Sequence, residues 1–216
     1  FGFNWSGDLQ AQKSVIDQLE RTLEKGFVLI RNFTLPDIDV VIPLILIGPG
    51  GIYVIHVTNV KGQFEAKGDQ WNTVSSGRGL PASTNLLESV SKYARALQIY
   101  LTRQKIQTSA PIEPILIAAN PGAHIDSMRP IVRVVMSDAI KQFAGTLAQA
   151  RPIWRSDSVH DVADRIVNPA PPVEPEAQTP QQATPAPAQT PETPQRTPSR
   201  ASAIFNASEK AASFNP

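Results

Sequence analysis

Histidines and carboxylates are the first residues to consider for chemistry, because they bind metals and move protons. The three histidines, His56, His124 and His160, are scattered and form no pair at helical spacing. His124 and Asp126 stand two residues apart after a candidate strand, where they are able to share a metal ion. We prefer an ordinary loop, because nothing else in the sequence supports a metal site there.

Basic residues offer a second kind of chemistry. Arg129, Arg133, Arg151 and Arg155 form a candidate patch for phosphate contacts. The alternative is that they are solvated or ion-paired, as scattered arginines usually are. The formal net charge of +1 gives no bulk attraction to nucleic acid or to anionic membranes. The absence of cysteine excludes disulfides and thiolate metal sites.

An apolar segment from Asp37 to Gly62 must position much of this chemistry. Two strand-like runs, Ile38–Ile47 and Ile52–Val57, flank Gly48-Pro49-Gly50-Gly51. Glycine permits positive φ and proline fixes φ, so this order predicts a hairpin. Pro43 interrupts the first run. Because proline has no N–H, it predicts a bulge or a locally unpaired position there.

Apolar periodicity predicts the surrounding elements. We expect four helices: one capped by Ser6–Asp8 and ending at Gly26, one opening between Pro81 and Thr84 and running past Leu101, one from Ser137 to Leu147, and one from Ser156 to Ile166. We expect further strands at Phe27–Phe33, Gln63–Lys67, Trp71–Val74, Pro114–Ala119 and Ile131–Met136, with a loop at Ser75–Leu80. No stretch approaches the ~20 apolar residues of a membrane span.

The composition changes after residue 167. Eleven of the 20 prolines fall in residues 168–216, and Val173 is the only large apolar residue between 168 and 203. Such a composition is typical of extended or disordered segments. We therefore predict a domain at 1–167, a Pro-rich linker or tail at 168–203 and a short anchor at 204–216. Ile204, Phe205 and Phe214 are its candidate partner anchors, and a weakly apolar, disordered end is the alternative.

The segment from Gly48 to Gly62, GPGGIYVIHVTNVKG, resembles the NERD (nuclease-related) domain, which typically reads close to GPGGVFVIETKNWKG there. Trp71 and Leu80-Pro81 fit later parts of the family pattern. The resemblance covers roughly Ser6–Gln149. It implies an α/β fold of the restriction-endonuclease-like PD-(D/E)XK type, with a mixed β-sheet core flanked by helices.

The resemblance also implies a chemistry that this sequence departs from. In the family, an Asp on the first hairpin strand and a Glu-x-Lys on the second hold a divalent cation and orient water. Those positions fall on Pro43, His56 and Thr58. The glutamate of the family's first helix falls on Gln12 or Asp8, and the sequence leaves that choice open. We expect no catalytic residues, no metal and no cofactor.

Possible substitutes for the missing groups are weak. Asp39, Lys61, Glu65 and Asp69 are all better interpreted as solvated or turn residues, and a single imidazole at His56 is a poor magnesium ligand.

The sequence therefore favours a non-catalytic scaffold or structural subunit that binds a protein partner through its body and its tail. One alternative is a nucleic-acid-binding module with a groove lined by Lys61, Lys67, Arg78 or Lys92, and another is a divergent metal-dependent nuclease. We expect a location in the cytoplasm or at the cytoplasmic face of a membrane assembly. Because the sequence starts at Phe1 rather than Met, we expect a processed chain or a fragment.

Overall fold

The computed structural model describes residues 5–23, 26–36, 38–106, 108 and 111–169. The chain divides into two units, Phe1–Pro172 and Val173–Pro216, and every described residue lies in the first. The Pro-rich segment and its anchors Ile204, Phe205 and Phe214 thus lie outside the described residues. The elements are α1 (Trp5–Thr22), β1 (Val28–Leu35), β2 (Val40–Gly48), β3 (Gly51–Thr58), β4 (Gly62–Lys67), β5 (Gln70–Ser75), β6 (Arg78–Pro81), α2 (Leu86–Arg103), β7 (Ile112–Ala118), β8 (Ala123–Met128), β9 (Arg133–Met136), the 3₁₀ turn η1 (Ser137–Ala139), α3 (Ile140–Ala148) and α4 (Ser156–Val167).

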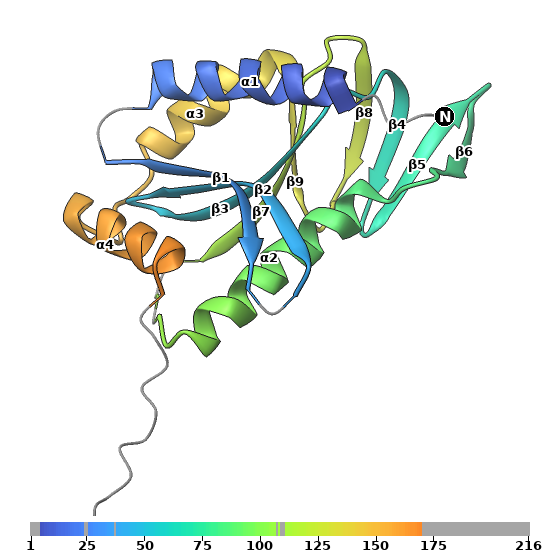
Figure 1. Ribbon diagram of the computed structural model, residues 1–216. Helices are drawn as coiled ribbons and strands as arrows, with labels where there is room; N and C mark the ends of the chain where they lie inside the picture. Colours follow the sequence, from blue (N-terminus) through green and yellow to red (C-terminus); the bar gives the residue numbers. More distant parts are fainter. Residues whose placement is uncertain (1–4, 24–25, 37, 107, 109–110, 170–216) are drawn as a thin grey trace, which may run out of the picture. The chain divides into compact units, whose positions relative to one another are not determined.

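The main sheet has five strands in the order β1-β2-β3-β7-β9 (Figure 1). The first three strands are antiparallel neighbours, whereas β3, β7 and β9 run parallel. The crossover between the parallel neighbours β3 and β7 runs through β4, β5 and β6 and then through helix α2. The α/β class with a mixed sheet flanked by helices, predicted from the sequence, is confirmed.

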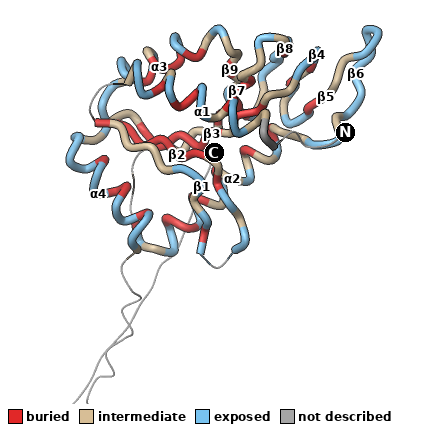
Figure 2. Tube along the Cα trace, turned by 45° about the horizontal axis from the view of Figure 1, so that its top comes forward, coloured by how far each residue is buried: buried red, intermediate tan, exposed pale blue. Residues whose placement is uncertain are grey.

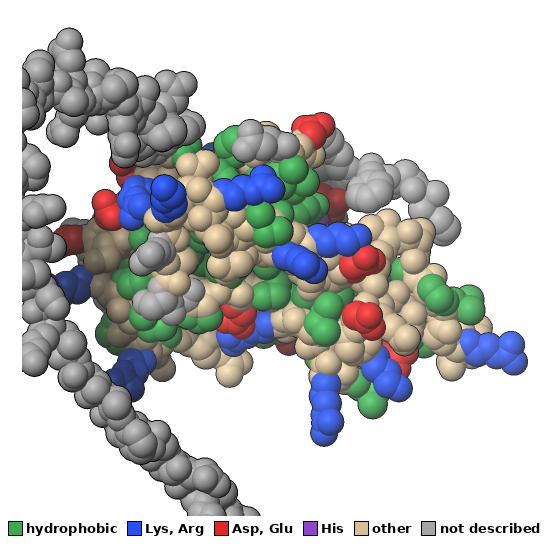
Figure 3. All heavy atoms as spheres, turned by 90° about the horizontal axis from the view of Figure 1, so that it is seen from below, with side chains coloured by type: hydrophobic (Ala, Val, Ile, Leu, Met, Phe, Trp, Pro, Cys, Tyr) green, Lys and Arg blue, Asp and Glu red, His purple; other side chains and the backbone are tan. Residues whose placement is uncertain are grey.

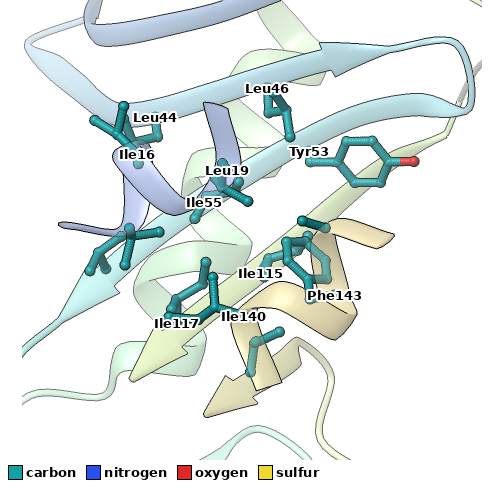
Figure 4. Close-up of a cluster of buried hydrophobic side chains, with 14 of the residues drawn as sticks. Ile16, Leu19, Leu44, Leu46, Tyr53, Ile55, Ile115, Ile117, Ile140 and Phe143 are labelled. Atoms are coloured by element: carbon teal, nitrogen blue, oxygen red, sulfur yellow. The ribbon is translucent and has the colours of Figure 1, made fainter. Parts of the chain in front are cut away.

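Helices cover both faces of this sheet. One face packs against α1 and α3 around Leu19, Leu44, Ile55 and Phe143 (Figure 4). The other face packs against α2 and α4, and Tyr100 donates a 2.8 Å hydrogen bond across that layer to the carbonyl of Ile166. In α2 the buried residues lie on one stripe; they are Leu87, Val90, Ala94, Leu97, Tyr100 and Leu101.

A second sheet, in the order β6-β5-β4-β8, extends the body. Its inner face carries a stacked pair, Phe64 and Trp71, with ring centroids 4.9 Å apart. The predicted hairpin across Gly68-Asp69 is confirmed by the pairing of Lys67 with Gln70. Figure 2 shows that buried residues gather on β2, β3 and β7, whereas β6 is exposed along its whole length.

Several predicted element boundaries were wrong. The expected loop Ser75–Leu80 contains strand β6, since Ser76 and Gly77 adopt positive φ and turn the chain back onto β5. The expected loop around His124 and Asp126 is strand β8, which gains a parallel partner in β4. Both strands pair with segments that local sequence patterns do not specify.

The predicted helix starts were also displaced. Helix α1 already begins at Trp5, so Ser6–Asp8 lie in its first turn. Helix α2 begins at Leu86, because the Asn85 side chain caps it by accepting a 3.1 Å hydrogen bond from the N–H of Glu88. Ser137 opens the 3₁₀ turn before α3, and Ser156 is the first residue of α4 rather than its cap.

Close contacts at the turn between β2 and β3 explain why it contains glycines. A side chain at Gly48 would collide with the Phe27 ring, and Gly51 has a φ of +156° with the Pro111 carbonyl close by. The carbonyl of Pro49 accepts hydrogen bonds from the N–H groups of Ile153 (2.7 Å) and Trp154 (3.0 Å). The turn therefore fixes the segment before α4 as well as the hairpin.

Candidate functional site

The β1–β2 hairpin is sharply kinked at Asn32 and Pro43. Arg31 pairs with Leu44 and Phe33 pairs with Ile42, so the register is the same on both sides of the kink. The residues that pack toward α2 and α4, however, are 28, 30, 33 and 35 on β1 and 40, 42, 45 and 47 on β2. The alternation of faces therefore shifts by one residue in each strand, at opposite positions of the pair. On β1 the extra residue is Asn32, which has a φ of +49°. On β2 it is Pro43, which has no N–H to pair.

This matched pair of bulges confirms the irregularity predicted at Pro43. Asp39 is an exposed turn residue, as the sequence analysis favoured. It lies just before β2, and the alternation of faces is interrupted between it and Leu44.

Strands β2 and β3 separate at the level of His56. Their register pairs run from Gly48 with Gly51 to Leu44 with Ile55, and none follows. Beyond this last pair, Pro43 on β2 and His56 on β3 are the next residues. On its other side β3 stays paired with β7 as far as Thr58 and Ala118. The end of β3 is therefore held from one side only.

His56 lies at this separation and is mostly buried. Its ring centroid is 6.2 Å from that of Tyr93 on α2, and its strand neighbour on β7 is Leu116. Nδ1 is buried and has no hydrogen-bond partner among the described residues. Burial lowers the pKa of His56 below its usual value, and the nearby Asp8 carboxylate offsets part of that effect. Burial is the larger of the two effects, so the net result favours a neutral imidazole at physiological pH.

Asp8 connects the first turn of α1 to the end of β3. Its Oδ1 accepts a 2.9 Å hydrogen bond from the N–H of Asn59. The side chains of Asn59 and Asn120 are linked at 3.2 Å, and Oδ1 of Asn120 accepts a 2.8 Å bond from the N–H of Gly122. Between the two positions left open by the sequence, Asp8 rather than Gln12 makes this contact with the end of β3.

Three residues of this arrangement were missed as site residues. Tyr93 falls within the helix expected after Pro81, and Asn59 falls within the segment that resembles the NERD domain, but neither signal marks a site residue. Asn120 begins an Asn-Pro-Gly turn at the end of a strand, which is a signal for a turn but not for a partner 61 residues away.

Thr58 stands where the family pattern has its lysine, and it is buried, with 5% exposure. It follows His56 at the two-residue spacing that places both side chains on the same face of β3. A threonine hydroxyl at this position carries no charge with which to orient a hydrolytic water.

The remaining carboxylate candidates lie on other elements. Glu65 on β4 accepts a 3.3 Å hydrogen bond from Asn72, and Asp126 is its register neighbour on β8. Asp69 lies in the exposed β4–β5 turn. His124 precedes Asp126 on the same exposed strand. Within the described ranges, no three His, Asp or Glu side chains come together as a metal would require.

The candidate cations are dispersed. Lys61, Lys67 and Arg78 are exposed, and Lys92 forms a 2.7 Å ion pair with Glu88. On the face drawn in Figure 3, Lys and Arg side chains are spread among acidic, polar and apolar groups and form no continuous basic surface.

Of the four arginines considered for phosphate, Arg133 lies 3.6 Å from a Glu113 oxygen and stacks over the Phe143 ring. Arg129 is exposed after β8, and Arg151 and Arg155 are exposed in the segment between α3 and α4. No helix in the described part of the chain has the length and apolar character needed to cross a bilayer.

A scan of protein-family models matches residues 7–119 to NERD, the nuclease-related domain. The match spans more than half of the 216 residues. The chain belongs to the NERD family. No curated protein and no solved structure matched it.

The matched NERD region runs from α1 to the end of β7, so it contains the kinked hairpin, the end of β3 and the Asp8–Asn59 contact. Strand β9, α3 and α4 follow it and complete the sheet and its two helical layers.

Proposed function

We propose that this NERD domain does not cleave nucleic acid and serves as a scaffold or structural subunit. One observation carries the proposal: Pro43 and His56 stand where β2 separates from β3, and Thr58 follows on the same face as His56. These are the positions that hold Asp, Glu and Lys in the family pattern. Hard divalent cations need several oxygen ligands, and this group of side chains offers only the Asp8 carboxylate nearby.

A neutral His56 further supports the proposal. Its pKa is lowered by burial, so at physiological pH the imidazole neither attracts a phosphodiester nor replaces the cation that Thr58 lacks. Asp8 also has another role, because it accepts the N–H of Asn59. The fold is then a rigid body, and the Pro-rich residues 168–203 connect it to the anchors Ile204, Phe205 and Phe214.

The first experiment measures cleavage. Plasmid and single-stranded DNA are incubated with the full chain and Mg²⁺ or Mn²⁺, beside the D8N/H56Q variant purified identically. Equal background cleavage by both proteins is the expected result. Cleavage by the natural chain that the variant lacks contradicts the proposal and supports the divergent nuclease.

The second experiment measures partner binding. The tagged full chain is purified from its own cells, beside a chain ending at Pro169 and a full chain in which Ile204, Phe205 and Phe214 are changed to Ser. We expect one protein to co-purify in stoichiometric amount with the natural chain and to be lost from both variants. An A203S/A207S chain serves as the matched control and should keep the partner. Retention of the partner by both tail variants contradicts the role given to the anchors.

A further inference from the structure

Helices α2 and α4 cover the same face of the main sheet and carry opposite charges on their outer sides. All four charged residues of α2 are exposed and three of them are basic; they are Glu88, Lys92, Arg95 and Arg103. Histidine aside, α4 also has four charged residues, all exposed, and three of them are acidic; they are Asp157, Asp161, Asp164 and Arg165. This layer therefore presents one basic and one acidic helix to the outside.

The acidic residues form one row along the outer side of α4. Asp157, Asp161 and Asp164 are spaced at i, i+4 and i+7, which brings them onto one side of a helix. The buried residues Val159 and Ile166 lie on the opposite side. With a rise of about 1.5 Å per residue, this acidic row is roughly 10 Å long.

The basic residues form a longer row on α2. Lys92 and Arg103 are separated by close to three helical turns, so they lie on one line of the helix, about 16 Å apart. Arg95 lies one turn after Lys92, and Ile99, which is 44% exposed, lies between Arg95 and Arg103. The acidic row of α4 thus fits within the length of the basic row of α2.

The two rows are not paired with each other inside the body. Among the residues that the structure describes, one ion pair joins two residues of α2 and the other joins β7 to β9. The helices nevertheless meet at their C-terminal ends, where Tyr100 donates its hydrogen bond to Ile166. Their outer rows face away from the sheet, where another molecule can reach them (Figure 1).

We propose that this layer is the contact surface of a homodimer, in which α2 of each copy lies over α4 of the other. A two-fold axis between the two helices brings the same surface of both copies together and joins each basic row to an acidic row. A second copy fits better than an unrelated protein, because this single layer carries both signs in equal number. The contact would also cover the exposed Ile99.

The dimer should be weak and sensitive to salt, because exposed ion pairs are individually weak and are screened by ions. This inference does not rest on the scaffold proposal, since a dimer of this kind neither needs nor excludes cleavage. Sedimentation equilibrium of the full chain tests it. In low salt the average mass should rise with protein concentration from one chain toward two, and about 0.5 M NaCl should weaken the association several-fold.

Charge reversal tests which surfaces meet. R95E/R103E and D161K/D164K should each stay monomeric, because each variant gives both helices the same sign. An equimolar mixture of the two variants should restore dimers, since the acidic α2 of one then meets the basic α4 of the other, and the converse pair also matches. Unchanged Tm values show that the variants are folded.

K13E/R21E is the matched control, because it reverses two exposed cations on α1, which covers the other face of the sheet. It should associate like the natural chain. A natural chain that stays monomeric at all concentrations would overturn the inference. Dimers that persist in both reversed variants, or a mixture of these variants that stays monomeric, would overturn the pairing of α2 with α4.

Discussion

Acidification should destabilise this domain through His56. Burial lowers the pKa of His56 in the folded state, and Asp8 opposes this only in part. In the unfolded chain the imidazole titrates near 6.5. The unfolded state therefore binds more protons between the two pKa values, so the free energy of unfolding rises with pH there. The contribution is complete above pH 6.5 and is lost as pH falls from 6.5 toward the folded-state pKa.

The size of the effect follows from the linkage relation. Within that window, one titrating group changes the free energy of unfolding by at most about 1.4 kcal/mol per pH unit. For a domain of this size, each kcal/mol corresponds to a Tm shift of roughly 2–4 °C. The measurement is urea denaturation, at pH steps between 8 and 5, of the natural chain and of H56Q, whose side chain does not titrate.

The difference between the two chains should be constant above about pH 7 and should shrink or reverse below 6.5. H124Q is the control, because His124 is exposed on β8, and it should follow the natural chain. D8N removes the charge that favours the imidazolium while retaining an acceptor for Asn59, so it should extend the loss to lower pH. Parallel curves for H56Q and the natural chain across the whole range would refute the assignment to His56.

Three further predictions concern stability. N32V should destabilise the domain by about 1–3 kcal/mol, because a β-branched residue is strained at the φ of +49°. T34V on the same strand should have little effect. Equal urea midpoints for the two variants would contradict the kink at Asn32. Y100F should cost about 1–3 kcal/mol, because it leaves the Ile166 carbonyl without its 2.8 Å donor, and an unchanged Tm would show that this bond is dispensable. A chain ending at Pro169 should keep the Tm of the full chain in calorimetry, since the three core clusters formed by the described residues lie within residues 11–166. Loss of cooperative unfolding would be the contrary result.

The sequence predicted most of the main sheet because its signals are local. Gly48 and Gly51 mark a turn, and the apolar runs on either side of it are typical of buried strands. Strands β6 and β8 were missed because their residues become strand only through pairing with β5 and β4. Local composition there, with Gly79 and Pro81 in β6, favours a loop.

The site was only partly predictable for the same reason. Pro43 signalled an irregular strand, but the compensating bulge at Asn32 depends on the cross-strand register, which the sequence does not display. Likewise, the choice between Asp8 and Gln12 depends on how α1 lies across the sheet. The contact from Asp8 to Asn59 joins residues 51 positions apart.

Asp8 is the residue on which the interpretation of this site depends most. A carboxylate near His56 would ordinarily favour retained catalysis. Here its Oδ1 already accepts the N–H of Asn59, at a strand end that β2 no longer covers. An unpaired buried N–H costs about 1–3 kcal/mol, so Asp8 has a structural reason to be present whatever the chemistry. A carboxylate that both caps β3 and partly offsets the burial of His56 needs no metal to explain it, and Pro43 and Thr58 supply neither the second carboxylate nor the cation that hydrolysis would require.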